Sequence, residues 1–134
     1  MKKIILAVLL LNLIFLVPLG AQTVAERFSV ISLAAEPQNY YDRYICVQGE
    51  MVPGSGRILN YSVKSKGFET DHHENFLYAF KVREQNREIN VIFDYPLDLK
   101  GGEKLVIYGY FLQSSNLPQI KLTNLIKAYS VVSY

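Results

Sequence analysis

The chain has 134 residues and a mass of 15.3 kDa, which suffices for one globular domain of ordinary size. Half of the residues are hydrophobic and 19% are charged, a balance too apolar for a disordered chain. The single cysteine, Cys46, excludes a disulfide within the chain and a zinc site with two or more cysteine ligands. Ten tyrosines and seven phenylalanines, without a tryptophan, favour β structure.

The first 21 residues are typical of a secretory signal peptide. Lys2 and Lys3 precede the apolar run Ile4–Val17, and Ala21 before Gln22 marks the expected cleavage site. The run has about 14 residues, fewer than the roughly 20 that a membrane-spanning helix needs. We therefore expect a signal peptide at 1–21, a domain at 22–134, a periplasmic or secreted protein, and no membrane span after cleavage. A retained segment acting as an anchor is the alternative.

Removal of the signal peptide changes the charge of the protein. The whole chain has 14 basic and 12 acidic residues, and Lys2 and Lys3 are two of the basic ones. The domain left after cleavage is therefore formally neutral. Binding to phosphate groups needs surplus lysine and arginine, so the sequence carries no strong nucleic-acid signal.

One helix is expected near the start of the domain, from Val24 to Ala35. Apolar residues there recur at steps of four, three and four, which is helical spacing. Thr23 and Glu26 fit a capping box at its start, and Pro37 ends the pattern.

The remaining chain predicts five strands, separated by turn residues. We expect them at Tyr44–Val52, Phe76–Arg83, Glu88–Tyr95, Glu103–Gln113 and Ile120–Val132. Ile58–Val63 is a candidate short strand, and the polar stretch Lys64–Asn75 is expected to be loop. Gly49 inside the first strand indicates a bulge or sharp bend. Alternation predicts that these side chains are buried: Ile45, Val47, Tyr78, Phe80, Val91, Phe93, Leu105 and Ile107.

The order of these elements resembles the OB-fold over about Ser29 to Tyr129. The resemblance lies in "YICVQGEMV", with its interior glycine, in the hairpin "FLYAFKVREQNREINVIFDY", and in "LKGGEKLVIYGYF" and "IKLTNLIKAY". It implies a mostly β, five-stranded OB-fold-like barrel with one N-terminal helix. The connection Pro96–Gly102 is too short for the helix that many OB-folds carry there, so the N-terminal helix is expected to cover that barrel end.

The chain is similar to two groups of OB-fold proteins. One comprises small secreted bacterial proteins linked to envelope stress tolerance. The other is the wider anticodon-binding-like group, whose members bind single-stranded nucleic acid. The predicted signal peptide favours the first group.

Four residues are the candidates for ligand binding. Tyr108 and Tyr110 face outward if Ile107 and Phe111 face the core, and Lys81 and Arg83 lie opposite Phe80 and Val82 on the hairpin. Tyrosine with lysine or arginine can stack sugars or bases. OB-folds bind ligands on strands two and three, between loops that correspond here to Pro53–Asn75 and Ser114–Gln119. The alternative is that the tyrosines merely cover the sheet beneath the helix.

Two other features have a chemical and a structural interpretation. His72 and His73, flanked by Asp71 and Glu74, are the candidate metal ligands, but a solvated loop is the favoured interpretation. Cys46 is expected to be buried beneath the helix or a loop. An intermolecular disulfide and a reactive thiol are its alternatives.

No nucleophile motif and no phosphate-binding glycine loop occurs in the sequence. We therefore expect a non-catalytic binding or adaptor module without a cofactor, whose partner is an envelope protein, a glycan or a small ligand. The main alternative is a single-stranded nucleic-acid-binding OB-fold protein. A metal- or haem-handling protein and an enzyme are the further alternatives.

The signal peptide makes a direct prediction about the mature protein. Protein recovered from the cell envelope should begin at Gln22, as measured by intact mass. A mass that retains Lys2 and Lys3 would instead identify an uncleaved anchor.

Overall fold

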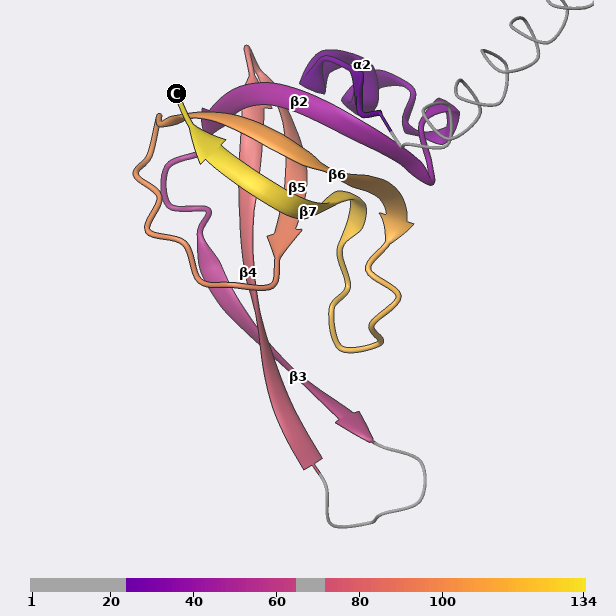
Figure 1. The fold of residues 1–134 in the computed structure, drawn as a ribbon, viewed down its shortest axis with the longest axis vertical. Helices are drawn as coiled ribbons and strands as arrows, with labels where there is room; N and C mark the ends of the chain where they lie inside the picture. Colours follow the sequence, from indigo (N-terminus) through magenta and orange to yellow (C-terminus); the bar gives the residue numbers. More distant parts are fainter. Residues whose placement is uncertain (1–23, 65–71) are drawn as a thin grey trace, which may run out of the picture.

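The computed structural model describes residues 24–64 and 72–134 (Figure 1). In chain order the elements are β1 (Glu26–Arg27), α2 (Val30–Ala35), a 3₁₀ turn (Pro37–Asn39), β2 (Arg43–Met51), β3 (Arg57–Lys64), β4 (His72–Glu84), β5 (Arg87–Phe93), β6 (Lys104–Ser114) and β7 (Thr123–Ser133). Among these residues no helix is long and apolar enough to cross a membrane.

Five of the strands close into a barrel. β2 pairs with β6, β6 with β7, β5 with β4, and β4 again with β2, all antiparallel, whereas β7 and β5 run parallel. The β2–β4 seam is short and joins only Glu50 to Arg83 and Met51 to Val82. This is the strand order of an OB-fold, a partly open five-stranded barrel. The predicted fold class is confirmed.

Gly49 lies where β2 turns from one side of the barrel to the other. Residues 43–50 of β2 pair with β6, and Glu50 and Met51 also pair with β4. A Cβ atom at Gly49 would lie 2.7 Å from the main-chain oxygen of Arg83 and 2.7 Å from a methyl group of Val82. Only glycine lets the two strands approach this closely. The predicted bend at Gly49 is confirmed.

The barrel interior holds the main apolar core. Six of the eight side chains predicted to be buried are at most 2% exposed, namely Ile45, Val47, Phe80, Val91, Leu105 and Ile107. Tyr78 and Phe93 are only half-buried, because they pair with one another at the point where β4 leaves the barrel. Partial burial of its phenol, with the nearby Asp98 carboxylate, raises the pKa of Tyr78.

The predicted helix Val24–Ala35 is too long at its start. Glu26 and Arg27 form the short strand β1 beside β2, and the Phe28 N–H donates to the Cys46 carbonyl at 3.1 Å. The helix begins only after Ser29, whose hydroxyl caps the Ser32 N–H at 3.0 Å. Val24 is 78% exposed, so it does not belong to the buried face. The proposed cap Thr23 lies outside the described residues.

α2 nevertheless covers a barrel end, as expected. Val30 and Leu33 are fully buried in the main core. The Val30 N–H donates to the Glu84 carboxylate at 3.0 Å, which fixes the start of the helix to the end of β4. Residues 94–103, between β5 and β6, contain no helix. Figure 1 shows α2 at one end of the barrel, and the β3–β4 hairpin extending from the other.

The stretch expected to be loop, Lys64–Asn75, is partly strand. β3 ends at Lys64 and β4 begins at His72, and the two strands keep a continuous register from Arg57–Ala79 to Lys64–His72. Residues 72–75, His-His-Glu-Asn, are all polar, so no apolar alternation indicated a strand there. The sequence therefore did not predict that β4 begins as early as His72. We call these paired segments, residues 57–64 and 72–79, the β-arm.

The close approach at Gly49 predicts a strong position effect on stability. Gly49→Val should lower the free energy of unfolding by about 1–3 kcal/mol, because the new side chain overlaps the main chain of β4. Gln48→Val, at an exposed strand position, should change it by less than about 0.5 kcal/mol. Urea melts of the two variants measure the difference. Equal midpoints would show that no bend depends on Gly49.

Candidate functional site

The outer face of β4 and β5 is divided into an apolar part and a polar part. The apolar part is a second core, in which Leu77, Ala79 and Ile92 pack under Ile120 and Leu125. Leu117 and Leu122 from the β6–β7 loop and Leu59 and Tyr61 from β3 lie around it. The protein's own side chains therefore cover the apolar part of this face.

The β6–β7 loop is held in place over this second core by Ser115. The buried Ser115 hydroxyl donates to the Ile120 carbonyl at 2.6 Å and accepts from the Leu117 N–H at 3.2 Å. The Ile120 N–H in turn donates to the Leu117 carbonyl at 3.0 Å. These hydrogen bonds fix the loop against the outer face of β4 and β5.

The polar part of the same face is hollow. A groove of about 440 Å³ lies over β4 and β5, between the turn that joins β2 to β3 and the β6–β7 loop. Its polar lining comes from Ser55, Arg57, Lys81, Glu88 and Asn90. A second hollow of about 270 Å³ shares Lys81, Glu88 and Asn90 with it and continues to Thr123, Asn124 and Ala34. We call the two hollows together the β4–β5 groove.

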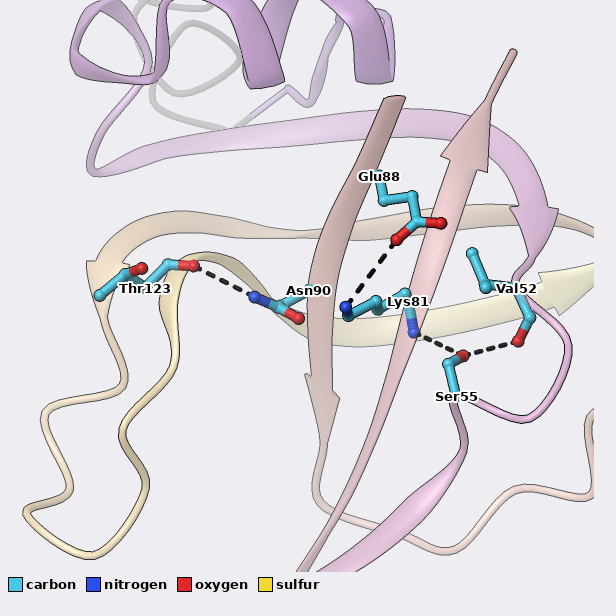
Figure 2. Close-up of polar contacts among 6 residues, drawn as sticks. All are labelled: Val52, Ser55, Lys81, Glu88, Asn90 and Thr123. Carbon is cyan, nitrogen blue, oxygen red and sulfur yellow. Dashed lines mark hydrogen bonds and ion pairs between the residues drawn. The ribbon is translucent and has the colours of Figure 1, made fainter. Parts of the chain in front are cut away.

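The turn Val52–Ser55 forms one wall of this groove. The Val52 N–H donates to the Lys81 carbonyl at 2.9 Å, and the Ser55 hydroxyl accepts from the Lys81 N–H at 3.0 Å. The same hydroxyl donates to the Val52 carbonyl at 2.7 Å (Figure 2). Ser55 thus replaces the main-chain partner that a continued β3 would have given to β4.

The groove floor presents both signs of charge. Lys81 Nζ lies 3.8 Å from the Glu88 carboxylate, and both side chains are about half exposed, so the pair is weak. The Asn90 amide donates to the Thr123 carbonyl at 3.3 Å, which leaves its side-chain oxygen facing the groove (Figure 2). Arg57 is exposed and has no ion-pair partner among the described side chains. The site can therefore both donate and accept hydrogen bonds.

The structure places the four predicted ligand-binding residues in three separate surroundings. Lys81 lies in the β4–β5 groove. Arg83, two residues on, lies 3.7 Å from the Glu50 carboxylate and lines another hollow of about 460 Å³, which Lys104 also lines. Tyr108 and Tyr110 lie on the outer face of β6, between β2 and β7. That all four act on one ligand stays a prediction, and no described contact joins them.

The outward direction of Tyr108 and Tyr110 is confirmed, but they do not lie beneath the helix. The Tyr110 ring packs against Tyr44 with a centroid distance of 5.2 Å and against Tyr129 with one of 5.8 Å. α2 packs mainly on β5 and β4 instead. The three rings are tilted to one another by 56° and 79°, so they form no flat platform for stacking a ligand.

Cys46 is buried, as predicted, with 4% of its surface exposed. Its neighbour on one side is Arg27 of the short strand β1, where the sequence indicated a helix or a loop. Its thiol is hydrogen-bonded to the Tyr108 phenol opposite on β6, and this bond raises the pKa of Tyr108. Its location is typical of a structural cysteine.

The candidate metal ligands cannot be placed in full. The main chain of His72 and His73 begins β4, opposite Lys64 and Val63. Their side chains and Asp71 lie outside the described part, so the alternative of a metal site there is untested. Among the described side chains, no three histidine, cysteine, aspartate or glutamate residues gather to hold a metal ion.

Sequence patterns predicted which face of the β4–β5 hairpin forms the groove, but they did not identify all of the residues that line it. Alternation along the hairpin placed Lys81 outward, and the same alternation extends to Glu88 and Asn90 on β5. Ser55 and Arg57 were expected only as members of the loop Pro53–Asn75 beside the ligand-binding face. Their positions in the groove depend on a turn that folds back over β4, which the sequence did not indicate.

Comparisons with known proteins add little to this geometry. No family model matches the chain, and no curated protein matches it. Among solved structures the chain is similar to a protein described as an aspartyl-tRNA synthetase of Leishmania major Friedlin, with 8% identity and a TM-score of 0.49. The match covers 84% of this chain and 21% of that one, so the chain spans about a fifth of its length. The fold assignment rests on the strand order, and the functional argument on the groove.

The hydrogen bonds of Ser55 to the Lys81 N–H and the Val52 carbonyl predict that loss of its hydroxyl lowers stability. Ser55→Ala should cost about 1 kcal/mol, because the Lys81 N–H loses its partner, and Ser55→Thr should restore most of it. Ser114→Ala is the matched control, since that hydroxyl makes only a long contact of 3.5 Å with Asn116. Hydrogen exchange of the Lys81 amide and urea melts report the change. An unaltered exchange rate of the Lys81 amide in Ser55→Ala would show that the Ser55 hydroxyl does not stabilise the turn.

Proposed function

We propose that this protein is an exported, non-catalytic OB-fold binding module whose ligand occupies the β4–β5 groove. The observation that carries the proposal is the hollow, polar half of the β4–β5 face. OB-folds use this face for ligands, between the loop joining strands one and two and the loop joining strands four and five. In this chain the corresponding walls are the Val52–Ser55 turn and the β6–β7 loop.

The lining of the groove favours a compact polar ligand. Arg57, Lys81 and the Asn90 amide supply donors, and Glu88 and the Asn90 oxygen supply acceptors. Sugar hydroxyls and peptide amides match such a mixed set, because each offers both a donor and an acceptor. The ligand class that fits is therefore a short glycan or a peptide segment of an envelope partner.

The groove is a poor fit to single-stranded nucleic acid. Such binders combine a basic track with exposed aromatic rings on which bases stack. Among the described residues that line the groove, the one aromatic residue is Phe80, which is 2% exposed and belongs to the barrel core. The apolar second core also blocks the path that a strand would follow across the rest of the face.

The hydrogen bonds of the groove hydroxyl support the non-catalytic role in this proposal. Ser55 both accepts from the Lys81 N–H and donates to the Val52 carbonyl. A serine nucleophile needs instead a hydrogen bond to a general base. Export is proposed from the apolar run Ile4–Val17 and the small residue Ala21.

The proposal predicts where a ligand perturbs the protein. In ¹⁵N-labelled protein titrated with a glycan and peptide extract of the host envelope, amide shifts should move at Ser55, Lys81 and Asn90. The double variant Lys81→Ala, Asn90→Ala should lose these shifts while retaining the fold, because both side chains are surface-facing. Shifts confined to Tyr108 and Tyr110, or no shifts at all, would contradict the groove as the site.

A labelled single-stranded oligonucleotide distinguishes the alternative function. We expect dissociation constants above roughly 10 μM at physiological ionic strength, at the weak end of non-specific binding. Sub-micromolar binding that weakens with salt, and that Lys81→Ala with Arg83→Ala abolishes, would favour a nucleic-acid-binding protein instead.

A further inference from the structure

β3 is a free edge of the sheet. The strand order ends at β3, which pairs with β4 over eight residues and with no other strand in the described part of the chain. The other end of the sheet, β1, has only two residues. A row of unpaired main-chain groups on a long edge is a template for another strand.

The hydrogen bonds of Lys81 establish which main-chain groups of β3 point outward. Both the N–H and the C=O of Lys81 point toward the turn between β2 and β3, where they meet Ser55 and Val52. Main-chain groups alternate sides along an antiparallel strand, so those of Ala79 and Leu77 point the same way and bond to β3. Their partners are Arg57 and Leu59. The N–H and C=O groups of Ile58, Asn60 and Ser62 therefore point away from β4.

The edge lacks two usual protections against pairing, a proline and a bulge, and its charged residues Arg57 and Lys64 lie only at its ends. Residues 57–64 contain no proline, and their register with β4 has no bulge. Ile58 is 57% exposed and Phe76 is 51% exposed. They lie on the same face of the β-arm, because Ile58 is opposite Tyr78 and Phe76 is opposite Asn60. A monomer thus presents both open hydrogen-bonding groups and apolar side chains here.

We propose that the free edge of β3 pairs with β3 of a second copy, antiparallel and about a two-fold axis at Asn60. In this register Ile58 is opposite Ser62 of the second copy, and Asn60 is opposite Asn60 of the second copy. Every outward N–H and C=O of these residues then finds a partner. The two β-arms form one continuous four-stranded sheet.

The side-chain pairs in this register are compatible with a dimer. Leu59 of each copy is opposite Tyr61 of the other, an aliphatic–aromatic pair of the kind that stabilises antiparallel strands. Arg57 is opposite Val63, so no two like charges meet across the interface. The domain that follows the predicted signal peptide is formally neutral, so two copies do not repel one another through net charge. An isologous contact of this kind closes on itself and pairs the β3 edges of both copies, which leaves only the two-residue strand β1 as an edge in each copy.

Sedimentation velocity over a wide range of protein concentration tests the dimer. The purified protein should change from monomer to dimer as its concentration rises. Asn60→Pro removes an N–H that the β3–β4 ladder does not use, and should weaken dimerisation about tenfold or more. Asn60→Thr keeps the N–H and should dimerise as the wild type does. A wild-type protein that stays monomeric, or an Asn60→Pro variant that dimerises equally well, would overturn the proposal.

A disulfide tests the register independently of any effect of proline on the strand. Directly paired residues at such a position have Cα atoms about 5.5 Å apart, within the usual range of about 4.4–6.8 Å for a disulfide. Asn60→Cys should therefore form a covalent dimer under mild oxidation. Asn86→Cys, exposed in the β4–β5 turn at the other end of the barrel, is the control and should not. Equal cross-linking of the two variants would exclude the proposed pairing.

Discussion

The structure depends on two successive amides at the end of β2, those of Met51 and the following Val52, which bond to the two neighbouring strands of the barrel. The Met51 N–H donates to the Glu103 carbonyl beside β6, and the Val52 N–H donates to the Lys81 carbonyl on β4, both at 2.9 Å. β2 can reach both neighbours only because it bends where Gly49 lies against the main chain of Arg83. Without this bend β2 could not pair with β4, and the barrel would stay open between these two strands.

The same bend produces the groove. Because the Val52–Ser55 turn occupies both main-chain groups of Lys81, β3 can pair with β4 only from Ala79 onward. A turn contributes fewer side chains to the sheet face than a strand does, so the face above Lys81, Glu88 and Asn90 stays hollow. On the far side of Ala79 the ladder resumes, and the β6–β7 loop closes the face with Leu117, Ile120 and Leu122. Binding and self-association are therefore proposed for neighbouring but separate surfaces, the groove and the β3 edge.

Sequence patterns predicted the parts of this structure that depend on local periodicity. The alternation around Phe80, Val91 and Ile107 located the strands and the barrel core, and the glycine inside the first strand located the bend. The start of the helix was wrong, because pairing of Arg27 beside Cys46 competes with helical spacing and depends on a distant strand. Ile58–Val63 was a candidate strand, but the extension of β4 to His72 was missed, because residues 72–75 are all polar and leave no hydrophobic pattern. Ser55 and Arg57 were predicted only as part of the loop Pro53–Asn75, because their positions in the groove arise when the turn folds back over β4.

Native-state hydrogen exchange at the β2 seam tests the closed barrel most directly. Local openings expose single amides at a low free-energy cost, whereas amides of a cooperative unit exchange only when the whole unit unfolds. If β2 closes the barrel, the Met51 and Val52 amides should exchange with the same free energy, equal to that of global unfolding. A protected Met51 amide beside a Val52 amide that exchanges as fast as a loop would show that the barrel is open between β2 and β4.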